Sequence, residues 1–203
     1  MMKGLYQNQI DKNIKNNKRK KMFKIEIDNE IHLELVHFSH SKEMLNLVNK
    51  NRKLFKQWLL WVNSVREVED EKKHIQSALE QYAKGQLVNC SIFYKGRLAG
   101  NVEIGMRKGY GIKKGELGYW LGAEFHGKGI MQKATAKMLE IGFEQYNLDK
   151  IMLKCAVHNE RSCNVAQKLG MSHEGRQREE IVVDGVVMDV DIYAILKREY
   201  LEK

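Results

Sequence analysis

The sequence predicts an α/β (α+β) domain with one mixed central sheet of about seven strands flanked by helices. Segments that alternate apolar and polar residues, as strands do, are interspersed with segments that have the helical repeat. Strand–helix–strand crossovers alternate with hairpin turns, which makes the sheet mixed rather than all-parallel. The 203-residue chain has no proline, repeat or linker, so residues 22–203 are predicted to form a single domain, in the order β-α-α-β-β-β-α-β-α-β-β.

The first part of the domain is predicted to form a hairpin or an opening strand pair, followed by helices. Residues 23–28 and 31–36 alternate apolar and polar side chains on either side of a polar turn. Ser41 is predicted to cap the next helix, because a serine hydroxyl can accept hydrogen bonds from the free N–H groups of a first turn. Two further helices are expected over residues 52–62 and 68–83.

The rest of the domain alternates strands and helices. The pair Lys95-Gly96 and the sequence Val183-Asp-Gly-Val186 are typical of tight hairpin turns. The run over residues 151–157 is almost entirely apolar, which predicts a strand buried on both faces. In order, the expected elements are strands 88–94, 97–106 and 115–121, a helix over 130–146 with Ile130, Ala134, Met138, Leu139, Ile141 and Phe143 buried, strand 151–157, a helix from Asn159 to Gly170, and two closing strands.

The composition is that of a soluble globular protein, with 43% hydrophobic and 30% charged residues. Residues 1–21 contain seven lysines and arginines against one aspartate, so they account for six of the nine net positive charges. We expect this segment to be a basic flexible arm, either a solvated leader without a role or a weak contact to an acidic partner such as ribosomal RNA. The domain itself is nearly balanced in charge, which argues against a nucleic-acid-binding surface on it.

Several classes of protein are disfavoured. The apolar run over residues 58–62 is far shorter than the roughly 20 residues that span a bilayer, and the N-terminus has no apolar signal region. Cys90, Cys155 and Cys163 form no Cys-x-x-Cys pair, which indicates a reducing cytoplasm rather than a disulfide framework. The seven histidines have no zinc-site spacing, so we expect no metal.

The segment over residues 115–134 is the most informative part of the chain. It predicts a strand, a turn at Gly127-Lys128-Gly129 and the start of a helix, which together direct backbone N–H groups and a helix dipole at a phosphate or pyrophosphate. A magnesium-dependent phosphate loop would need Ser or Thr where Gly129 stands. A dinucleotide fingerprint would need glycine at Gln132 and an acidic residue after the next strand, and both are missing.

The remaining candidate is a coenzyme A loop, and here the residues resemble the GNAT superfamily of N-acetyltransferases. Residues 124–129, Glu-Phe-His-Gly-Lys-Gly, resemble its Gln/Arg-x-x-Gly-x-Gly/Ala loop, with a departure at Glu124. Residues 159–162 and 166–171 resemble its Asn-x-x-Ser and Lys-Leu-Gly-Phe segments. Further segments within 51–59, 118–121 and 184–200 resemble the ribosomal-protein (RimJ/RimL-type) branch, so that the resemblance covers residues 23–202.

The resemblance implies a single GNAT domain that moves acetyl directly from acetyl-CoA to a primary amine, without a metal. It implies that Glu116 is the general base, with an ordered water or a merely exposed carboxylate as alternatives. Ser162 would protonate the leaving thiolate, or would merely be a residue of the first helical turn. Asn159 would bind pantetheine, or would merely cap the helix. The residues implied to bind the cofactor are Trp120 and Leu121 through their backbone, His126, Gly127, Lys128, Gly129, Ile130, Met131, Asn159 and Ser162.

Three neighbouring side chains have simpler interpretations. Cys163 is expected to be a small buried residue rather than an acetylated nucleophile. Trp58 and Trp61 belong to the helical pair that walls the acceptor groove in this superfamily, and their spacing also fits burial. The side chain of Trp120 is expected to pack in the core.

The acceptor is the open question. The leading hypothesis is a protein N-terminal α-amine, such as that of a ribosomal protein. One alternative is a small-molecule amine, namely a polyamine, an antibiotic or an amino-acid derivative. Another is a non-catalytic protein that associates with ribosomes or nucleic acid through residues 1–21. The branch also makes a homodimer plausible.

Overall fold

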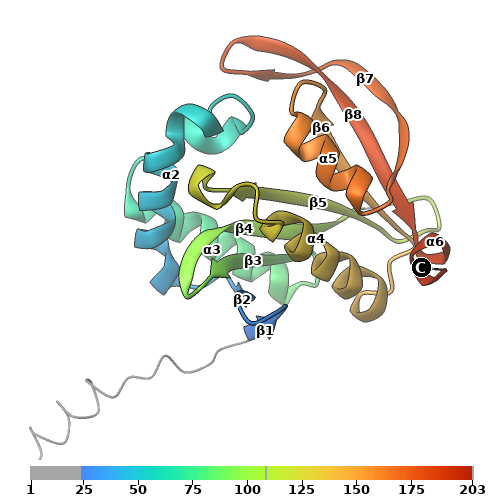
Figure 1. The fold of residues 1–203 in the computed structure, drawn as a ribbon, viewed down its shortest axis with the longest axis horizontal. Helices are drawn as coiled ribbons and strands as arrows, with labels where there is room; N and C mark the ends of the chain where they lie inside the picture. The colour runs from blue at the N-terminus through green and yellow to red at the C-terminus, as the bar shows by residue number, and fades with distance from the viewer. Residues whose placement is uncertain (1–23, 108, 203) are drawn as a thin grey trace, which may run out of the picture.

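The computed structural model describes residues 24–107 and 109–202, which form one mixed eight-stranded sheet with helices on both faces (Figure 1). The predicted basic arm, residues 1–21, lies outside the described residues. The strand order is β1-β2-β3-β4-β5-β6-β8-β7, and β5 and β6 are the parallel neighbours. The strands are β1 (Lys24–Glu26), β2 (Ile31–Leu35), β3 (Leu87–Tyr94), β4 (Arg97–Arg107), β5 (Lys114–Leu121), β6 (Lys150–Ala156), β7 (Ser172–Val183) and β8 (Val186–Leu196).

The helices cover opposite faces of this sheet. Successive strand residues point to opposite faces, and Trp120 packs against Phe55 while Tyr119 contacts Ser162. The helix that carries Phe55 therefore lies across the sheet from the helix that carries Ser162. The helices are α2 (Ser41–Phe55), α3 (Val68–Ala83), α4 (Ile130–Glu140), α5 (Glu160–Lys168) and α6 (Lys197–Leu201), with short 3-10 turns η1 (Phe38–His40), η2 (Leu60–Asn63) and η3 (Ala123–Phe125) and a π-helical turn η4 (Ile141–Gln145).

The predicted class and element types are confirmed, with one more strand than expected. The opening segment forms two strands, β1 and β2, paired antiparallel. Both predicted hairpins are present, and their turns have the positive φ angles of type I′ geometry: 50° and 75° at Lys95 and Gly96, and 49° and 81° at Asp184 and Gly185. No helix in the described ranges is long and apolar enough to cross a membrane.

Two helical predictions are wrong at their boundaries. Residues 52–62 do not form a separate helix: α2 continues to Phe55, and a turn then leads into η2. Ser41 does not cap α2, because it is the first helical residue and its hydroxyl donates to the carbonyl of Phe38 at 2.8 Å. The predicted helix over 130–146 is α4 followed by the π-helical turn η4.

The core is formed largely as the sequence predicts. The expected inner face of α4 and η4 is at most 3% exposed at Ile130, Ala134, Met138, Leu139, Ile141 and Phe143. Strand β6 is the exception, because Ile151 and Leu153 are buried while Lys154 is exposed. The expectation of burial on both faces is therefore wrong at Lys154, which lines a cavity and whose ammonium donates to Gln177 Oε1 at 2.9 Å and to Glu180 Oε1 at 3.3 Å on β7.

Candidate active site

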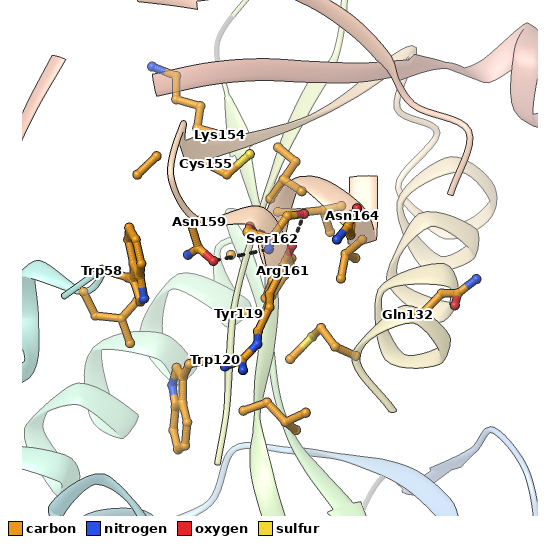
Figure 2. A pocket seen from close by; sticks show the side chains of 18 of the residues that line it. Trp58, Tyr119, Trp120, Gln132, Lys154, Cys155, Asn159, Arg161, Ser162 and Asn164 are labelled. Carbon is orange, nitrogen blue, oxygen red and sulfur yellow. Dashed lines mark hydrogen bonds between the residues drawn. The ribbon is translucent and has the colours of Figure 1, made fainter. Parts of the chain in front are cut away.

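The site begins where β5 and β6 separate. Their parallel register runs from Lys114↔Lys150 to Leu117↔Leu153 and then stops. Strand β5 nevertheless stays paired with β4 as far as Leu121. The segment Gly118–Leu121 thus has a free edge, and beside it lies a cavity of about 800 Å³. Figure 2 shows this cavity between α5, the start of α4 and the end of α2.

The free edge of β5 exposes a specific set of backbone N–H groups. The N–H of Gly122 donates to the carbonyl of Ala99 at 2.9 Å, and the register continues through Asn101↔Trp120. Because paired and unpaired residues alternate in an antiparallel ladder, the N–H of Trp120 points toward β4. The N–H groups of Tyr119 and Leu121 point toward the cavity. The sequence placed the backbone donors at Trp120 and Leu121, and the geometry moves one of them to Tyr119.

The glycine turn has the backbone conformation that an anion site needs. Gly127 and Gly129 have φ angles of 75° and 70°, and a Cβ at either position would have nothing within 4 Å. Glycine is therefore required by the backbone rather than by space. Helix α4 begins at Ile130 without a side-chain cap, so its first N–H groups remain available. Five of the residues assigned to the cofactor line the cavity, namely His126, Gly127, Gly129, Ile130 and Met131.

Lys128 and Glu124 belong to the loop's support instead. The Lys128 ammonium donates to the carbonyl of Glu124 at 2.7 Å, and Lys128 is not among the residues that line the cavity. The Glu124 carboxylate accepts from Lys50 at 2.7 Å and from Asn51 at 3.3 Å. Burial alone would raise the pKa of Glu124, but these hydrogen bonds outweigh it and lower the pKa. Glu124, which stands where the superfamily motif has Gln or Arg, therefore connects the loop to α2.

His126 connects three parts of the site. Arg161 donates to its Nδ1 at 3.1 Å, and since a guanidinium only donates, the imidazole proton lies on Nε2. His126 Nε2 then donates to the carbonyl of Leu121 at 3.0 Å. The loop, the end of β5 and the first turn of α5 are thus held together. Arg161 was not predicted, because nothing in the sequence shows that α5 reaches the loop.

The start of α5 brings Asn159 and Ser162 to the cavity. The side chain of Asn159 caps the helix, because its Oδ1 accepts from the N–H of Ser162 at 3.3 Å. Ser162 Oγ lies 3.0 Å from the hydroxyl of Tyr119, whose single proton can be donated either to this Oγ or to the Ser162 carbonyl, which is 3.3 Å away (Figure 2). Burial raises the pKa of Tyr119, so the phenol stays protonated. Tyr119 was missed, although strand alternation places it opposite Trp120.

Glu116 on β5 also lines the cavity. It shares a face of β5 with Gly118 and Trp120, as the alternation predicted. Its Oε2 accepts from Nε of Arg107 at 3.0 Å, and its side chain is 27% exposed. The carboxylate therefore reaches the cavity while paired with a guanidinium.

Thiols and aromatic rings complete the walls. Cys155 and Cys163 are free and buried, with their sulfurs 3.2 Å apart, and burial raises the pKa of the Cys155 thiol. Cys163 is thus a buried residue, as expected. Trp58 lines the cavity, whereas Trp61 packs on Trp120 at a ring distance of 6.0 Å. Within the described part of the chain, His, Cys, Asp and Glu side chains form no group that could hold a metal ion.

The family of the chain follows from a sequence comparison. A profile described as the acetyltransferase (GNAT) domain matches residues 32–172, which include β5, the glycine turn and α5. The chain belongs to the GNAT acetyltransferase family. This acetyltransferase is an N-acetyltransferase that uses acetyl-CoA, and the resemblance seen in the motifs is confirmed.

Relatives and neighbours of this GNAT acetyltransferase include ribosomal-protein enzymes. It is 28% identical over 180 residues to the putative ribosomal N-acetyltransferase YdaF of Bacillus subtilis, covering 88% of this chain and 98% of YdaF. It is 27% identical to the ribosomal-protein-serine acetyltransferase of Escherichia coli, covering 84% and 94%. Among solved structures, RimL, a ribosomal alpha-N-protein acetyltransferase in complex with coenzyme A, matches with a TM-score of 0.81 at 25% identity, covering 85% of this chain and 97% of RimL. The microcin self-immunity acetyltransferase MccE, in complex with acetyl-CoA and AMP, matches with a TM-score of 0.79 at 27% identity, covering 84% and 94%.

Proposed function

We propose that this enzyme acetylates the N-terminal α-amine of a protein, with a ribosomal protein as the best-supported acceptor. The observation that carries the proposal is that one cavity reaches residues on both faces of β5, since both Tyr119 and Trp120 line it. A donor that enters from the α4–α5 side can thus meet an acceptor that enters from the α2 side. The near full-length similarity to YdaF and to the E. coli ribosomal-protein-serine enzyme supports a protein acceptor.

Acetyl-CoA would lie against the residues that were predicted to bind the cofactor. The N–H groups that follow Gly127 would bind the pyrophosphate at the positive end of α4. Asn159 uses Oδ1 as a cap and keeps its Nδ2 for a pantetheine carbonyl. Arg161 adds a guanidinium beside His126, where phosphate charge would be neutralised.

The chemistry would take place between Leu121 and Ser162. The N–H groups of Tyr119 and Leu121 would stabilise the tetrahedral oxyanion, because they face the gap and need no rearrangement. Ser162 would then donate its proton to the departing thiolate. Glu116, directly or through a water, would remove the proton of the attacking amine. Holding both substrates in one cavity makes the transfer effectively intramolecular, which accounts for much of the rate.

The remaining expectations concern the enzyme's surroundings. We expect it to act in the cytoplasm, where ribosomal proteins are made, and residues 1–21 to add at most a weak contact to ribosomal RNA. A homodimer fits the branch. The RNA contact is separable from catalysis: removal of residues 1–21 is expected to reduce co-sedimentation with ribosomes while acetylation continues.

The acceptor can be identified by thiol release from acetyl-CoA in the presence of a panel of amines. The panel contains peptides that begin with serine or alanine, the same peptides with a blocked N-terminus, spermidine and an aminoglycoside. We expect turnover of a peptide with a free N-terminus and none of its blocked form. Faster turnover of spermidine or the aminoglycoside would instead assign a small-molecule acceptor, and the absence of both turnover and acetyl-CoA binding would contradict the enzyme function.

A further inference from the structure

Glu103 is a carboxylate in the middle of the sheet. It lies on β4 between Val102 and Ile104, which are fully buried, yet Glu103 itself is partly exposed. It is directly opposite Gly118 on β5 and so shares the face of Glu116 and Trp120. A charged side chain in the centre of an eight-stranded sheet is costly to bury unless it is paired or reaches water. Its position therefore needs an explanation.

Gly118 leaves the space beside which the carboxylate of Glu103 lies. A Cβ at Gly118 would lie 3.1 Å from Glu103 Oε1 and 3.2 Å from its Cγ, so the carboxylate rests over the space that the missing side chain leaves. Gly118 itself lines the cavity. Among the described residues, Glu71 Oε1 is the buried side-chain oxygen that has no hydrogen-bond partner. Glu103 Oε1 also has no partner but is not buried in this sense, so it is exposed to solvent. Gly118 lines the cavity together with Glu116 and Trp120 of the same face, so this oxygen lies at the border of the cavity, although Glu103 is not itself a lining residue.

A chain of buried amides fixes the direction of this carboxylate. Asn101 Nδ2 donates to Asn89 Oδ1 at 2.6 Å, and Asn89 Nδ2 donates to Glu103 Oε2 at 2.5 Å. Both asparagines are at most 3% exposed. The amides occupy Oε2 and leave Oε1 toward Gly118. Such a buried and satisfied network holds a side chain in one orientation.

The two carboxylates of this face differ in their cationic partners. Glu116 pairs with Arg107 at 3.0 Å. Within residues 24–107 and 109–202, no lysine, arginine or histidine forms an ion pair with Glu103. Its carboxylate thus faces Gly118 without a cationic partner among the described residues.

We propose that Glu103 binds the ammonium group of the acetyl acceptor and thereby selects cationic amines. This inference rests on the proposed transfer to an amine. An α-amine has a pKa near 8 and arrives mostly protonated at neutral pH, so the carboxylate oxygen at Gly118 attracts it before proton removal. Glu103 then places the nitrogen beside the free N–H edge of β5, and Glu116, which is paired with Arg107, removes the proton directly or through a water.

The decisive variant is Glu103→Gln, which keeps the size and the acceptor for Asn89 but presents an NH₂ group at Gly118. We expect the KM for a peptide with a free N-terminus to rise roughly 10- to 100-fold, the size of a lost charged hydrogen bond, while acetyl-CoA affinity and Tm stay close to wild type. Glu30→Gln is the matched control, because Glu30 forms an exposed ion pair with Lys95. Glu103→Asp keeps the charge and should recover part of the affinity.

A binding measurement keeps this inference separate from the proposed function. Calorimetry with the enzyme–CoA complex and the serine-starting peptide or spermidine measures acceptor binding without turnover. We expect binding to wild type and to Glu30→Gln, and a loss of at least tenfold with Glu103→Gln. Equal acceptor affinity and equal KM in Glu103→Gln would overturn the role of Glu103 while leaving the acetyltransferase function intact. A wild-type enzyme that binds none of these amines would contradict both.

Discussion

At the scale of single residues, the contact between Tyr119 and Ser162 links the two sides of the gap. The phenol can donate to Ser162 Oγ at 3.0 Å, which leaves the serine proton free for the departing thiolate. Because Tyr119 remains protonated, it acts by positioning Ser162 rather than by giving up its own proton. The pair thus connects the strand that holds the thioester with the helix that would protonate the sulfur.

Tyr119→Phe removes this hydroxyl and nothing else. We expect kcat to fall about tenfold, the order of one lost hydrogen bond, with the affinity for acetyl-CoA nearly unchanged. Steady-state kinetics would compare two acetyl donors, acetyl-CoA and an acetyl thioester of a less basic thiol. The loss of kcat should be smaller for the second donor, because its thiolate is the better leaving group. Tyr193→Phe, on β8, is the control. An equal loss with both leaving groups would indicate a purely structural role.

Glu71 provides a residue-scale prediction about stability. It is buried on α3, its Oε1 has no partner, and burial raises its pKa from 4.5 to about 7. The folded state then binds a proton that the unfolded state releases between these values, so stability falls as the pH rises from about 4.5 to 7. Glu71→Gln should be more stable than wild type at pH 8, by up to about 3 kcal/mol, and similar at pH 4.5.

Urea unfolding of wild type and Glu71→Gln at the two pH values would measure this difference. Glu69→Gln, on the exposed side of the same helix, should show no such dependence, because Glu69 is 59% exposed and pairs with Lys72. A Glu71→Gln effect of the same size at both pH values would show that the carboxyl does not titrate in this range.

At the scale of elements, the sequence correctly predicted the helices and strands that depend on a local pattern of apolar and capping residues. Residues 68–83 form the expected helix, and Asn159 caps α5 where its position before Glu160 suggested. The failures occur where tertiary contacts decide. Residues 56–63 leave the helix so that Val62 enters a second apolar cluster with Phe55. Lys154 interrupts an apolar run where the end of β6 borders the cavity and its ammonium contacts β7, and no local pattern reveals either contact.

The glycine turn before α4 allows a test of the phosphate loop as an element. Gly129→Ala introduces a side chain at a φ of 70°, which costs about 1–3 kcal/mol in any L-residue. Gly185→Ala causes the same strain at a φ of 81° in the distant β7–β8 turn. We expect both variants to lose similar stability, but only Gly129→Ala to lose acetyl-CoA affinity, by about tenfold or more.

Thermal unfolding and acetyl-CoA titration of the two variants would distinguish the effects. If Gly185→Ala weakened acetyl-CoA binding as much as Gly129→Ala, the loss would reflect general instability. Retained affinity in Gly129→Ala would place the pyrophosphate elsewhere.

At the scale of the whole molecule, the sequence indicated the donor side of the site better than the acceptor side. The residues 124–129 and 159–162 are contiguous motifs, so their chemistry can be recognised before folding. Tyr119, Arg161 and Glu103 acquire their roles only when β5 separates from β6 and adjacent strands align. Strand register across the sheet, which placed Glu103 opposite Gly118, depends on long-range pairing that periodicity does not fix.

The single cavity across both faces of β5 makes a prediction about the order of chemical events. Donor and acceptor can be held together, so acetyl should pass directly between them, and initial rates with both substrates varied should give intersecting double-reciprocal lines. A covalent route through Cys163 is disfavoured, because this thiol is buried and is not among the residues that line the cavity. The neighbouring Cys155 does line the cavity, but burial raises the pKa of its thiol, and thiolate is the reactive form. After prolonged incubation with acetyl-CoA alone, the intact mass should therefore be unchanged in wild type and in Cys163→Ala. Parallel lines, together with a stable acetyl adduct that Cys163→Ala abolishes, would instead establish a thioester intermediate beside Ser162.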